Sequence, residues 1–347
     1  MKNLADYQNE INKCSKCGLC QSVCPIFKET GNECSVSRGL FVMLSGVLNG
    51  NLKLTQNINK YLSMCLKCGK CKDFCPSEID VCKILEVAKY EYVKNTLLGR
   101  FIFLLESKLV FGNLIKLFKK KYQIFNPQES DKLKLLYFRG CVGKIFNDTE
   151  NLLKKIPNIE IIEKNFDCCG IPFLSSGNLE RYEEVKNYNL SLIDSDCILT
   201  DCASCESTLK SYFEKECPKF INIGELVVEQ NVNFEAAEHI KITFHKPCHL
   251  KNDDFIKPLF LNIENVEYIE MNDSCCGFAG EFALNNPKLS NLILKKKIDN
   301  ILNTGADIVV TTCPSCILGI KKGLFGVKKA PKVMSLSEFL LTLKIID

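Results

Sequence analysis

Two short runs of cysteine constrain this chain more than any other feature. Each run has the spacing C-x₂-C-x₂-C-x₃-C and is followed by proline. They supply Cys14, Cys17, Cys20 and Cys24, then Cys65, Cys68, Cys71 and Cys75. In proteins with two cubane clusters, three thiolates of such a run bind one cluster and the fourth binds the other. We therefore assign one [4Fe–4S] cluster to Cys14, Cys17, Cys20 and Cys75, and a second to Cys65, Cys68, Cys71 and Cys24.

A zinc site is the alternative for these runs. Zinc is commonly bound by two C-x₂-C pairs that lie far apart, whereas each run here places four cysteines within eleven residues. The chain has 22 cysteines in 347 residues, and its start, MKNLADYQNE, has no basic and apolar leader. We therefore expect a cytoplasmic protein whose thiols bind metal rather than form disulfides.

Charge and hydropathy argue against two classes of protein. The 45 basic and 41 acidic residues give a net charge of +4, without the basic excess typical of nucleic-acid-binding proteins. The most apolar stretch, 97–118, is interrupted by Arg100, Glu106 and Lys108. A membrane-spanning helix needs about 18 uninterrupted apolar residues. We therefore expect a buried or interdomain helix there and no nucleic-acid partner.

An internal repeat begins near residue 132. Cys141 and Cys248 are 107 positions apart, and so are the two Cys-Cys-Gly sequences; the two later C-x-x-C pairs are 111 apart. A repeat that holds across three landmarks indicates two copies of one structural unit. Short apolar runs in the two copies predict strands at 133–138, 159–162 and 197–200, and at 240–244, 266–269 and 308–311.

Strands that alternate with helical segments predict parallel sheets, whose ligands bind near the ends of the strands. The predicted fold class is therefore multidomain α/β, with a helical two-cluster ferredoxin domain followed by two repeated α/β domains. The insert between the cysteine runs, 40–62, is predicted to be helical. We place the domains at 1–96, 132–238 and 239–347, with a helical connector over 97–131.

Each α/β copy contributes five cysteines. These are Cys141, Cys168, Cys169, Cys202 and Cys205 in the first copy, and Cys248, Cys275, Cys276, Cys313 and Cys316 in the second. Five thiolates exceed what one cubane or one zinc ion binds, so either an irregular cluster is held or some cysteines do redox chemistry. The remaining four complete no motif, and we expect them to be small buried hydrophobic residues: Cys34, Cys82, Cys197 and Cys217.

The order of cysteine, Cys-Cys-Gly and C-x-x-C resembles the CCG-domain family. In its heterodisulfide reductase members the five-cysteine set binds a noncubane [4Fe–4S] cluster, so the resemblance implies one or two further clusters here. The whole order is similar to the iron–sulfur subunit of glycolate oxidase (glycolate dehydrogenase). Two stretches of the chain are also similar to that subunit. The first, between the cysteine runs, contains Gly31-Asn-Glu33, Arg38-Gly39 and Leu48-Asn-Gly50, and the second is Cys275-Cys-Gly-Phe-Ala-Gly280-Glu-Phe-Ala-Leu284.

The resemblance implies an electron-transfer subunit of a 2-hydroxy-acid dehydrogenase complex, with glycolate or lactate as the substrate. No glycine-rich nucleotide motif occurs in the sequence, so a partner flavoprotein is expected to oxidise the substrate. Quinone or a membrane-bound acceptor would then receive the electrons, with the chain in the cytoplasm or peripheral on the inner face of the membrane.

Three alternatives remain open at this point. Both C-x-x-C pairs are complete, as in heterodisulfide reductases, whereas the last pair is often incomplete in glycolate subunits. The first alternative is therefore a thiol–disulfide oxidoreductase subunit. The second is the iron–sulfur subunit of anaerobic glycerol-3-phosphate dehydrogenase, in which the cysteine motifs have a similar order. The third is a zinc-binding interaction scaffold.

Overall fold

The computed structural model describes residues 3–97, 99–101, 103, 124–125, 133–141, 148–213 and 215–346. Its contacts divide the chain into two compact units. Unit 1 comprises Met1–Gly112, Pro172–Glu183 and Cys275–Lys295, and unit 2 comprises Asn113–Ile171, Glu184–Ser274 and Lys296–Asp347. Three boundaries fall inside helices: after the first residue of α11 (Ile171–Ser176), within α12 (Leu179–Leu190) and within α17 (Pro287–Thr304).

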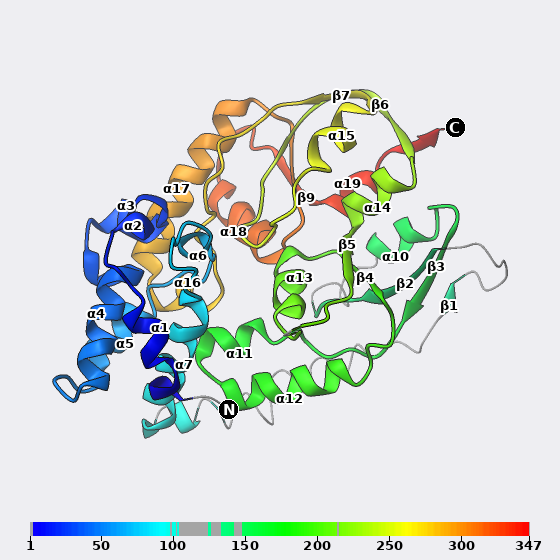
Figure 1. Ribbon diagram of the computed structural model, residues 1–347. Coiled ribbons are helices and arrows are strands. Elements are labelled where there is room, and N and C mark those ends of the chain that lie inside the picture. Colours follow the sequence, from blue (N-terminus) through cyan, green and yellow to red (C-terminus); the bar gives the residue numbers. More distant parts are fainter. Residues whose placement is uncertain are drawn as a thin grey trace. The chain divides into compact units, whose positions relative to one another are not determined.

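Unit 1 is helical in its described residues (Figure 1). Besides two short 3₁₀ helices, η1 (Leu4–Tyr7) and η2 (Glu33–Ser35), its elements are α1 (Gln8–Asn12), α2 (Leu19–Val23), α3 (Pro25–Thr30), α4 (Ser37–Leu48), α5 (Gln56–Leu62), α6 (Lys70–Asp73), α7 (Val81–Lys94), most of α11 (Ile171–Ser176), and α16 (Glu281–Asn285). The helical insert predicted over 40–62 is confirmed as α4 and α5, which are separated by residues 49–55.

The two cysteine runs have the same local backbone. Gly18 precedes α2 with φ +85° and Gly69 precedes α6 with φ +75°, in a region that glycine adopts without a steric penalty. Lys16 and Lys67, two residues earlier in each run, also have positive φ values. The duplicated sequence therefore folds into a duplicated cysteine loop.

The core of unit 1 is built by α4 and α7. Leu40 and Leu44 from α4 are buried with Ile84 and Ala88 from α7. Leu179, from the distant segment 172–183, belongs to the same cluster of buried side chains. The ferredoxin-like region therefore completes its core with residues that come much later in the chain.

Unit 2 contains two sheets with the same strand order. In the first, β2 (Leu133–Phe138), β3 (Ile159–Glu163), β4 (Cys197–Thr200) and β5 (Lys219–Asn222) are parallel in the order β3-β2-β4-β5. In the second, β6 (Asn233–Phe244), β7 (Ile263–Tyr268), β8 (Ile308–Thr311) and β9 (Lys332–Ser335) are parallel in the order β7-β6-β8-β9. The predicted fold class, with two repeated α/β regions and parallel sheets, is confirmed.

Short antiparallel strands extend both sheets, and helices connect the parallel ones. β1 (Ile124–Phe125) pairs with β3, and β10 (Lys344–Ile346) pairs with β6. The helices are α10 (Asp148–Leu153), α13 (Ala203–Lys210), α14 (Ile223–Glu229), α15 (Ile256–Leu261), α18 (Pro314–Leu324) and α19 (Leu336–Leu341), with parts of α12 and α17. α13 and α18 each begin just after a central strand, β4 and β8 respectively.

All six predicted strands exist, and three of them differ in their bounds: β3 ends one residue later than predicted and β7 ends one residue earlier. β6 begins seven residues earlier than predicted and β7 begins three residues earlier. The early part of β6 carries exposed charged residues but pairs with β10 near the end of the chain, which local hydropathy cannot reveal. Most of the helical connector predicted over 97–131 lies outside the described residues, and the domain boundaries stay predictions.

The two repeats of unit 2 share one hydrophobic core. Leu135 of β2 and Val310 of β8 are fully buried in the same cluster as Phe339 of α19. Thr149 Oγ1 and Ser337 Oγ lie 2.9 Å apart, and the backbone N–H of Ala203 donates to Thr312 O at 3.0 Å. These contacts fix the carboxyl ends of β4 and β8 beside each other.

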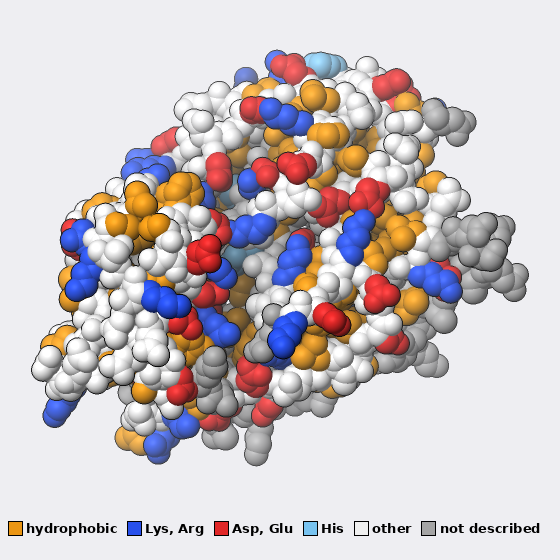
Figure 2. Space-filling view, in the orientation of Figure 1, with side chains coloured by type: hydrophobic (Ala, Val, Ile, Leu, Met, Phe, Trp, Pro, Cys, Tyr) orange, Lys and Arg blue, Asp and Glu red, His pale blue; other side chains and the backbone are white. Residues whose placement is uncertain are grey.

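Surface composition agrees with the nearly balanced charge. Figure 2 shows basic and acidic side chains interspersed over the visible face rather than gathered into one field. None of the described helices combines the length and the apolar character that crossing a bilayer requires.

Candidate metal centres

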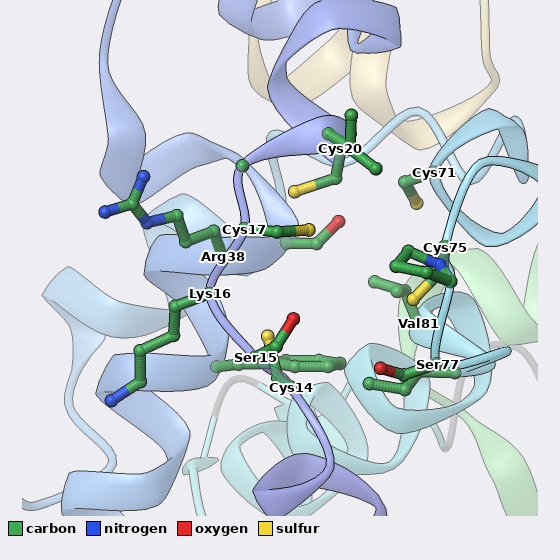
Figure 3. A pocket seen from close by; sticks show the side chains of 16 residues that line it. Cys14, Ser15, Lys16, Cys17, Cys20, Arg38, Cys71, Cys75, Ser77 and Val81 are labelled. Atoms are coloured by element: carbon green, nitrogen blue, oxygen red, sulfur yellow. The ribbon is translucent and has the colours of Figure 1, made fainter.

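The first pocket of unit 1 is lined by five cysteines from both runs: Cys14, Cys17, Cys20, Cys71 and Cys75. In Figure 3 the sulfur atoms of Cys17, Cys20, Cys71 and Cys75 face a common space, while the side chains of Lys16 and Arg38 extend away from it. The first run thus meets the last cysteine of the second run. Converging thiols without a competing carboxylate form a donor set that suits an iron–sulfur cluster.

Cys17 is the exposed member of this pocket. The backbone N–H of Leu19 donates to its sulfur and lowers the pKa of the Cys17 thiol. Because the thiolate is the form that binds metal, the loop at Gly18 favours a ligand at this position.

The second pocket of unit 1 is also lined by five cysteines: Cys24, Cys65, Cys68, Cys71 and Cys82. Cys24 comes from the first run, and the following Pro25 begins α3. Four of the five are those predicted for the second cluster, and Cys71 lines both pockets. From the sequence, Cys82 was expected to be a small buried hydrophobic residue rather than part of a metal site. It belongs to neither run and lies in α7 one helical turn before Leu85, another lining residue.

The thiols of the second pocket differ in their protonation. The Cys82 thiol donates to Cys65 and lowers the pKa of Cys65 to about 7. Burial raises the pKa of Cys71 to about 12. A thiolate at Cys71 therefore needs a cation beside it, a requirement that iron would meet.

The first CCG site lies within unit 2, at the carboxyl ends of β2, β3 and β4. Cys168 Sγ lies 4.0 Å from Cys141 Sγ. The thiols of Cys168 and Cys205 donate to Cys169 and lower the pKa of Cys169 to about 5. A Cβ atom at Gly140 would lie only 3.0 Å from Cys205 Sγ, so the absence of a side chain there lets the backbone pass close to the sulfur.

Two side chains hold the Cys-Cys loop of this site. Asn189 Nδ2 donates to Cys168 O at 3.0 Å, and Tyr212 OH donates to Cys169 O at 2.7 Å. Asn189 Oδ1 also accepts from the backbone N–H of Asp167 at 2.8 Å. These two residues could not be identified from the sequence, because cysteine spacing does not indicate that Asn189 of α12 and Tyr212, just after α13, reach the loop.

The cysteines of the second CCG repeat are divided between the units. Cys248, Cys313 and Cys316 belong to unit 2, where Cys248 follows β6 and the other two flank the start of α18; Cys275 and Cys276 belong to unit 1. Within unit 1, the backbone N–H of Gly277 donates to Cys275 Sγ at 3.3 Å. Within unit 2, the Cys316 thiol lowers the pKa of Cys313 to about 7.

The two C-x-x-C motifs interact within unit 2. Ser204, between Cys202 and Cys205, has its Oγ 2.9 Å from His249 Nδ1 and 3.7 Å from Cys313 Sγ. The first repeat therefore contributes a hydroxyl group to the surroundings of a cysteine of the second repeat.

His245 distinguishes the second repeat from the first. It lies immediately after β6, at the position that Phe138 occupies in the first repeat, and it is fully buried. Within the described part of the chain, neither ring nitrogen has a hydrogen-bond partner, and burial lowers the pKa of His245 well below its usual range. A ring nitrogen lies within 4.8 Å of Cys316 Sγ, so a nitrogen donor is available that the first repeat lacks.

Comparison with known families agrees with this architecture. Residues 10–79 match the 4Fe-4S dicluster domain, and residues 135–210 and 242–321 each match the cysteine-rich domain called CCG. The chain is 29% identical to an uncharacterized iron–sulfur protein of Methanocaldococcus jannaschii, with 93% of this chain and 70% of that protein aligned.

Two further relatives have names that state an activity. The chain is 26% identical to a subunit of the CoM/CoB fumarate reductase of Methanothermobacter marburgensis, over 92% of this chain and 70% of that protein. It is 23% identical to a probable glycolate oxidase iron–sulfur subunit of Bacillus subtilis, over 96% of this chain and 94% of that protein.

Proposed function

Since the chain belongs to the iron–sulfur proteins that join a 4Fe–4S dicluster domain to two CCG domains, we propose that it is the electron-transfer subunit of a 2-hydroxy-acid dehydrogenase complex. Glycolate is the substrate we propose for the complex, and lactate is the second candidate. Support comes from the order of the motifs and from the Bacillus subtilis protein named a probable glycolate oxidase iron–sulfur subunit, which aligns with this chain over nearly its whole length.

The observation that carries the proposal is the pair of adjoining cysteine pockets in unit 1. We propose that Cys14, Cys17, Cys20 and Cys75 bind one [4Fe–4S] cluster and that Cys65, Cys68, Cys71 and Cys24 bind the other. Cys71 lines both pockets, so two clusters held there would be close neighbours. When bound, such clusters supply one-electron transfer.

The protein's own contribution is to hold the thiols and to set their exposure. The loops at Gly18 and Gly69 turn the cysteines inward, while Cys17 stays exposed. We propose that electrons enter from a partner flavoprotein on the Cys17 side. We further propose one or two noncubane clusters at the five-cysteine CCG sites, and quinone or a membrane-bound acceptor as the exit on the cytoplasmic face.

A thiol–disulfide oxidoreductase subunit is the second candidate. The specific observation in its favour is Cys169, whose pKa of about 5 makes it a thiolate at neutral pH beside two further thiols. Its side chain is only 2% exposed, so a disulfide substrate would have to displace protein atoms to reach it. This burial favours a cluster ligand over a nucleophile at Cys169.

The deciding experiment is substrate bleaching of the native complex. The protein is tagged in its host, purified anaerobically with its partners, and mixed with glycolate or lactate while the visible charge-transfer absorbance of the clusters is followed. The proposal predicts bleaching and a co-purifying flavoprotein. A complex with intact clusters that bleaches with neither acid would overturn it.

The matched test for the second candidate uses the same preparation. Clusters reduced with dithionite and freed of excess reductant are mixed with a panel of organic disulfides. Our proposal predicts that the clusters remain reduced and that no free thiol appears. Stoichiometric thiol release would instead establish disulfide reduction.

A further inference from the structure

Cys82 is a fifth sulfur in a pocket where four suffice. A cubane cluster takes one thiolate for each iron, and Cys24, Cys65, Cys68 and Cys71 already provide that number. Cys82 nevertheless lines the same pocket, although it stands outside both runs. Cys82 is therefore not needed as an iron ligand, and its place in this pocket has to have another reason.

The start of α7 fixes the position of Cys82. Asp80 caps this helix by accepting the backbone N–H of Lys83 at 3.3 Å. Val81 and Ile84, on either side of Cys82, are buried in the core of unit 1. The thiol is thus carried by a rigid helix end rather than by a mobile loop.

The contact between Cys82 and Cys65 has a defined direction. Cys82 and Cys65 line the same pocket, and their side chains share a hydrogen bond. Cys65 also accepts the backbone N–H of Lys67 at 3.4 Å. A cysteine that binds iron does so as the thiolate, which can only accept a hydrogen bond. With Cys65 as the ligand, the thiol of Cys82 is therefore the donor.

We propose that Cys82 is a positioning residue for the second cluster, where its thiol donates a hydrogen bond to the ligand Cys65 and raises the reduction potential of that cluster. This inference rests on the ligand assignment made in the proposed function. Reduction adds negative charge to a cluster and to its ligand sulfurs, so a donor to one of those sulfurs stabilises the reduced state more than the oxidised one.

The first cysteine run has no counterpart of Cys82. Cys82 is seven positions after Cys75, and the residue seven positions after Cys24 is Gly31, which has no side chain. The thiol donor is therefore specific to the second run, whereas in the first run the hydroxyl of Ser15 donates to Cys17.

The test is an EPR-monitored redox titration of the full-length holoprotein. Cys82→Ala removes the donor and is expected to shift the midpoint potential of one cubane to more negative values, while the other cubane keeps its midpoint. Cys82→Ser keeps a hydroxyl donor and should fall between the wild type and Cys82→Ala. Cys34→Ala, which changes a cysteine that lines neither cysteine pocket, should leave both midpoints unchanged.

Two results would overturn the inference. The first is a Cys82→Ala protein whose two cubane midpoints equal those of the wild type. The second is the loss of one cluster's iron from both Cys82 variants, which would make Cys82 a ligand rather than a donor. A wild-type protein without cubane EPR signals would instead refute the ligand assignment itself, so the two failures are distinguishable.

Discussion

At the scale of single residues, Gly39 shows how a motif between the cysteine runs supports the site. A Cβ atom at this position in α4 would lie 2.1 Å from the backbone oxygen of Glu33. We predict that Gly39→Ala destabilises the protein by about 1–3 kcal/mol, the usual range for overpacking, since a backbone atom cannot move aside as a side chain can. Chemical denaturation of the holoprotein, followed by circular dichroism, measures the effect.

Gly46 in the same helix is the matched control. A Cβ atom there would meet Cδ1 of Leu52 at 2.8 Å, and this is the end of a flexible side chain. Because alanine is favoured over glycine inside a helix by about 1 kcal/mol, Gly46→Ala should be neutral or slightly stabilising. If both variants lost the same free energy of unfolding, the contact with Glu33 would not be the reason that position 39 requires glycine.

The ligand assignment has its own test at residue scale. Cys68→Ser should lose the EPR signal and iron of one dicluster-domain cubane, because serine oxygen is a poor ligand for iron–sulfur clusters, and should slow electron transfer. Cys276→Ser is the control and should leave both ferredoxin-type signals intact. Unchanged iron content and rate in Cys68→Ser would refute its role.

The limit of sequence inference is also visible at this scale. The eight cysteines of the two runs could be predicted from their spacing, because a short loop that wraps a cluster imposes that spacing. Cys82 could not, because a donor from a neighbouring helix has no fixed distance in sequence from the ligand it contacts. Only the register of α7 relative to the pocket identifies it.

At the scale of elements, a buried ion pair joins α7 to two distant segments of unit 1. Lys89 is 4% exposed, donates to Ser175 O at 2.6 Å and pairs with Glu281 of α16 at 2.5 Å. Lys67, between Cys65 and Cys68, likewise donates to the carbonyl of Leu174 in α11. The cysteine loop and α7 are therefore attached to the segments that follow the two Cys-Cys-Gly sequences.

We predict that Lys89→Met destabilises unit 1 by about 2 kcal/mol, because it leaves the Ser175 carbonyl and the Glu281 carboxylate without their cation. Glu281 is partly exposed, so the loss of stability should be smaller than for a fully buried ion pair. Lys94→Met is the control, because Lys94 and Glu180 are both more than half exposed and such pairs contribute only ~0–1 kcal/mol. Differential scanning calorimetry of both variants makes the comparison. A Lys94→Met loss as large as that of Lys89→Met would contradict this account.

Strand prediction succeeded where the strand is central and apolar, as in β2, β4 and β8. It missed β5 and β9, which are four residues long and start with an exposed lysine. Their place is set by pairing with β4 and β8. Such pairing is a tertiary property that the local sequence of β5 and β9 does not show.

At the scale of the whole molecule, removal of iron should affect the two units unequally. The helices that carry or follow the cysteines, α2, α3 and α6, have five, six and four residues, too few to be stable without the contacts around them. We predict that reduction and chelation abolish hydrogen-exchange protection in these helices, while β2 and β8 stay protected in their shared core. Hydrogen-exchange mass spectrometry checks this, and uniform loss across both units would contradict it.

Local sequence patterns did not predict which segments of the chain make up unit 1. The motifs indicated a self-contained domain over 1–96, but the unit defined by contacts also takes in Pro172–Glu183 and Cys275–Lys295. Which late segment packs on an early core depends on the complementarity of the folded surfaces. Cysteine spacing and hydropathy carry no information about it.

This interleaving sets the order of events while the chain is being made. The cysteine runs leave the ribosome early, but the last segment of their unit ends at Lys295. At translation rates of ~5–20 residues per second, the 183 residues between Gly112 and Lys295 take roughly 10–40 s to synthesise. Eight thiols therefore stay in an incomplete fold during that time, and the machinery that delivers iron and sulfide must either reach the nascent chain or protect it from other metals until Lys295 has been added.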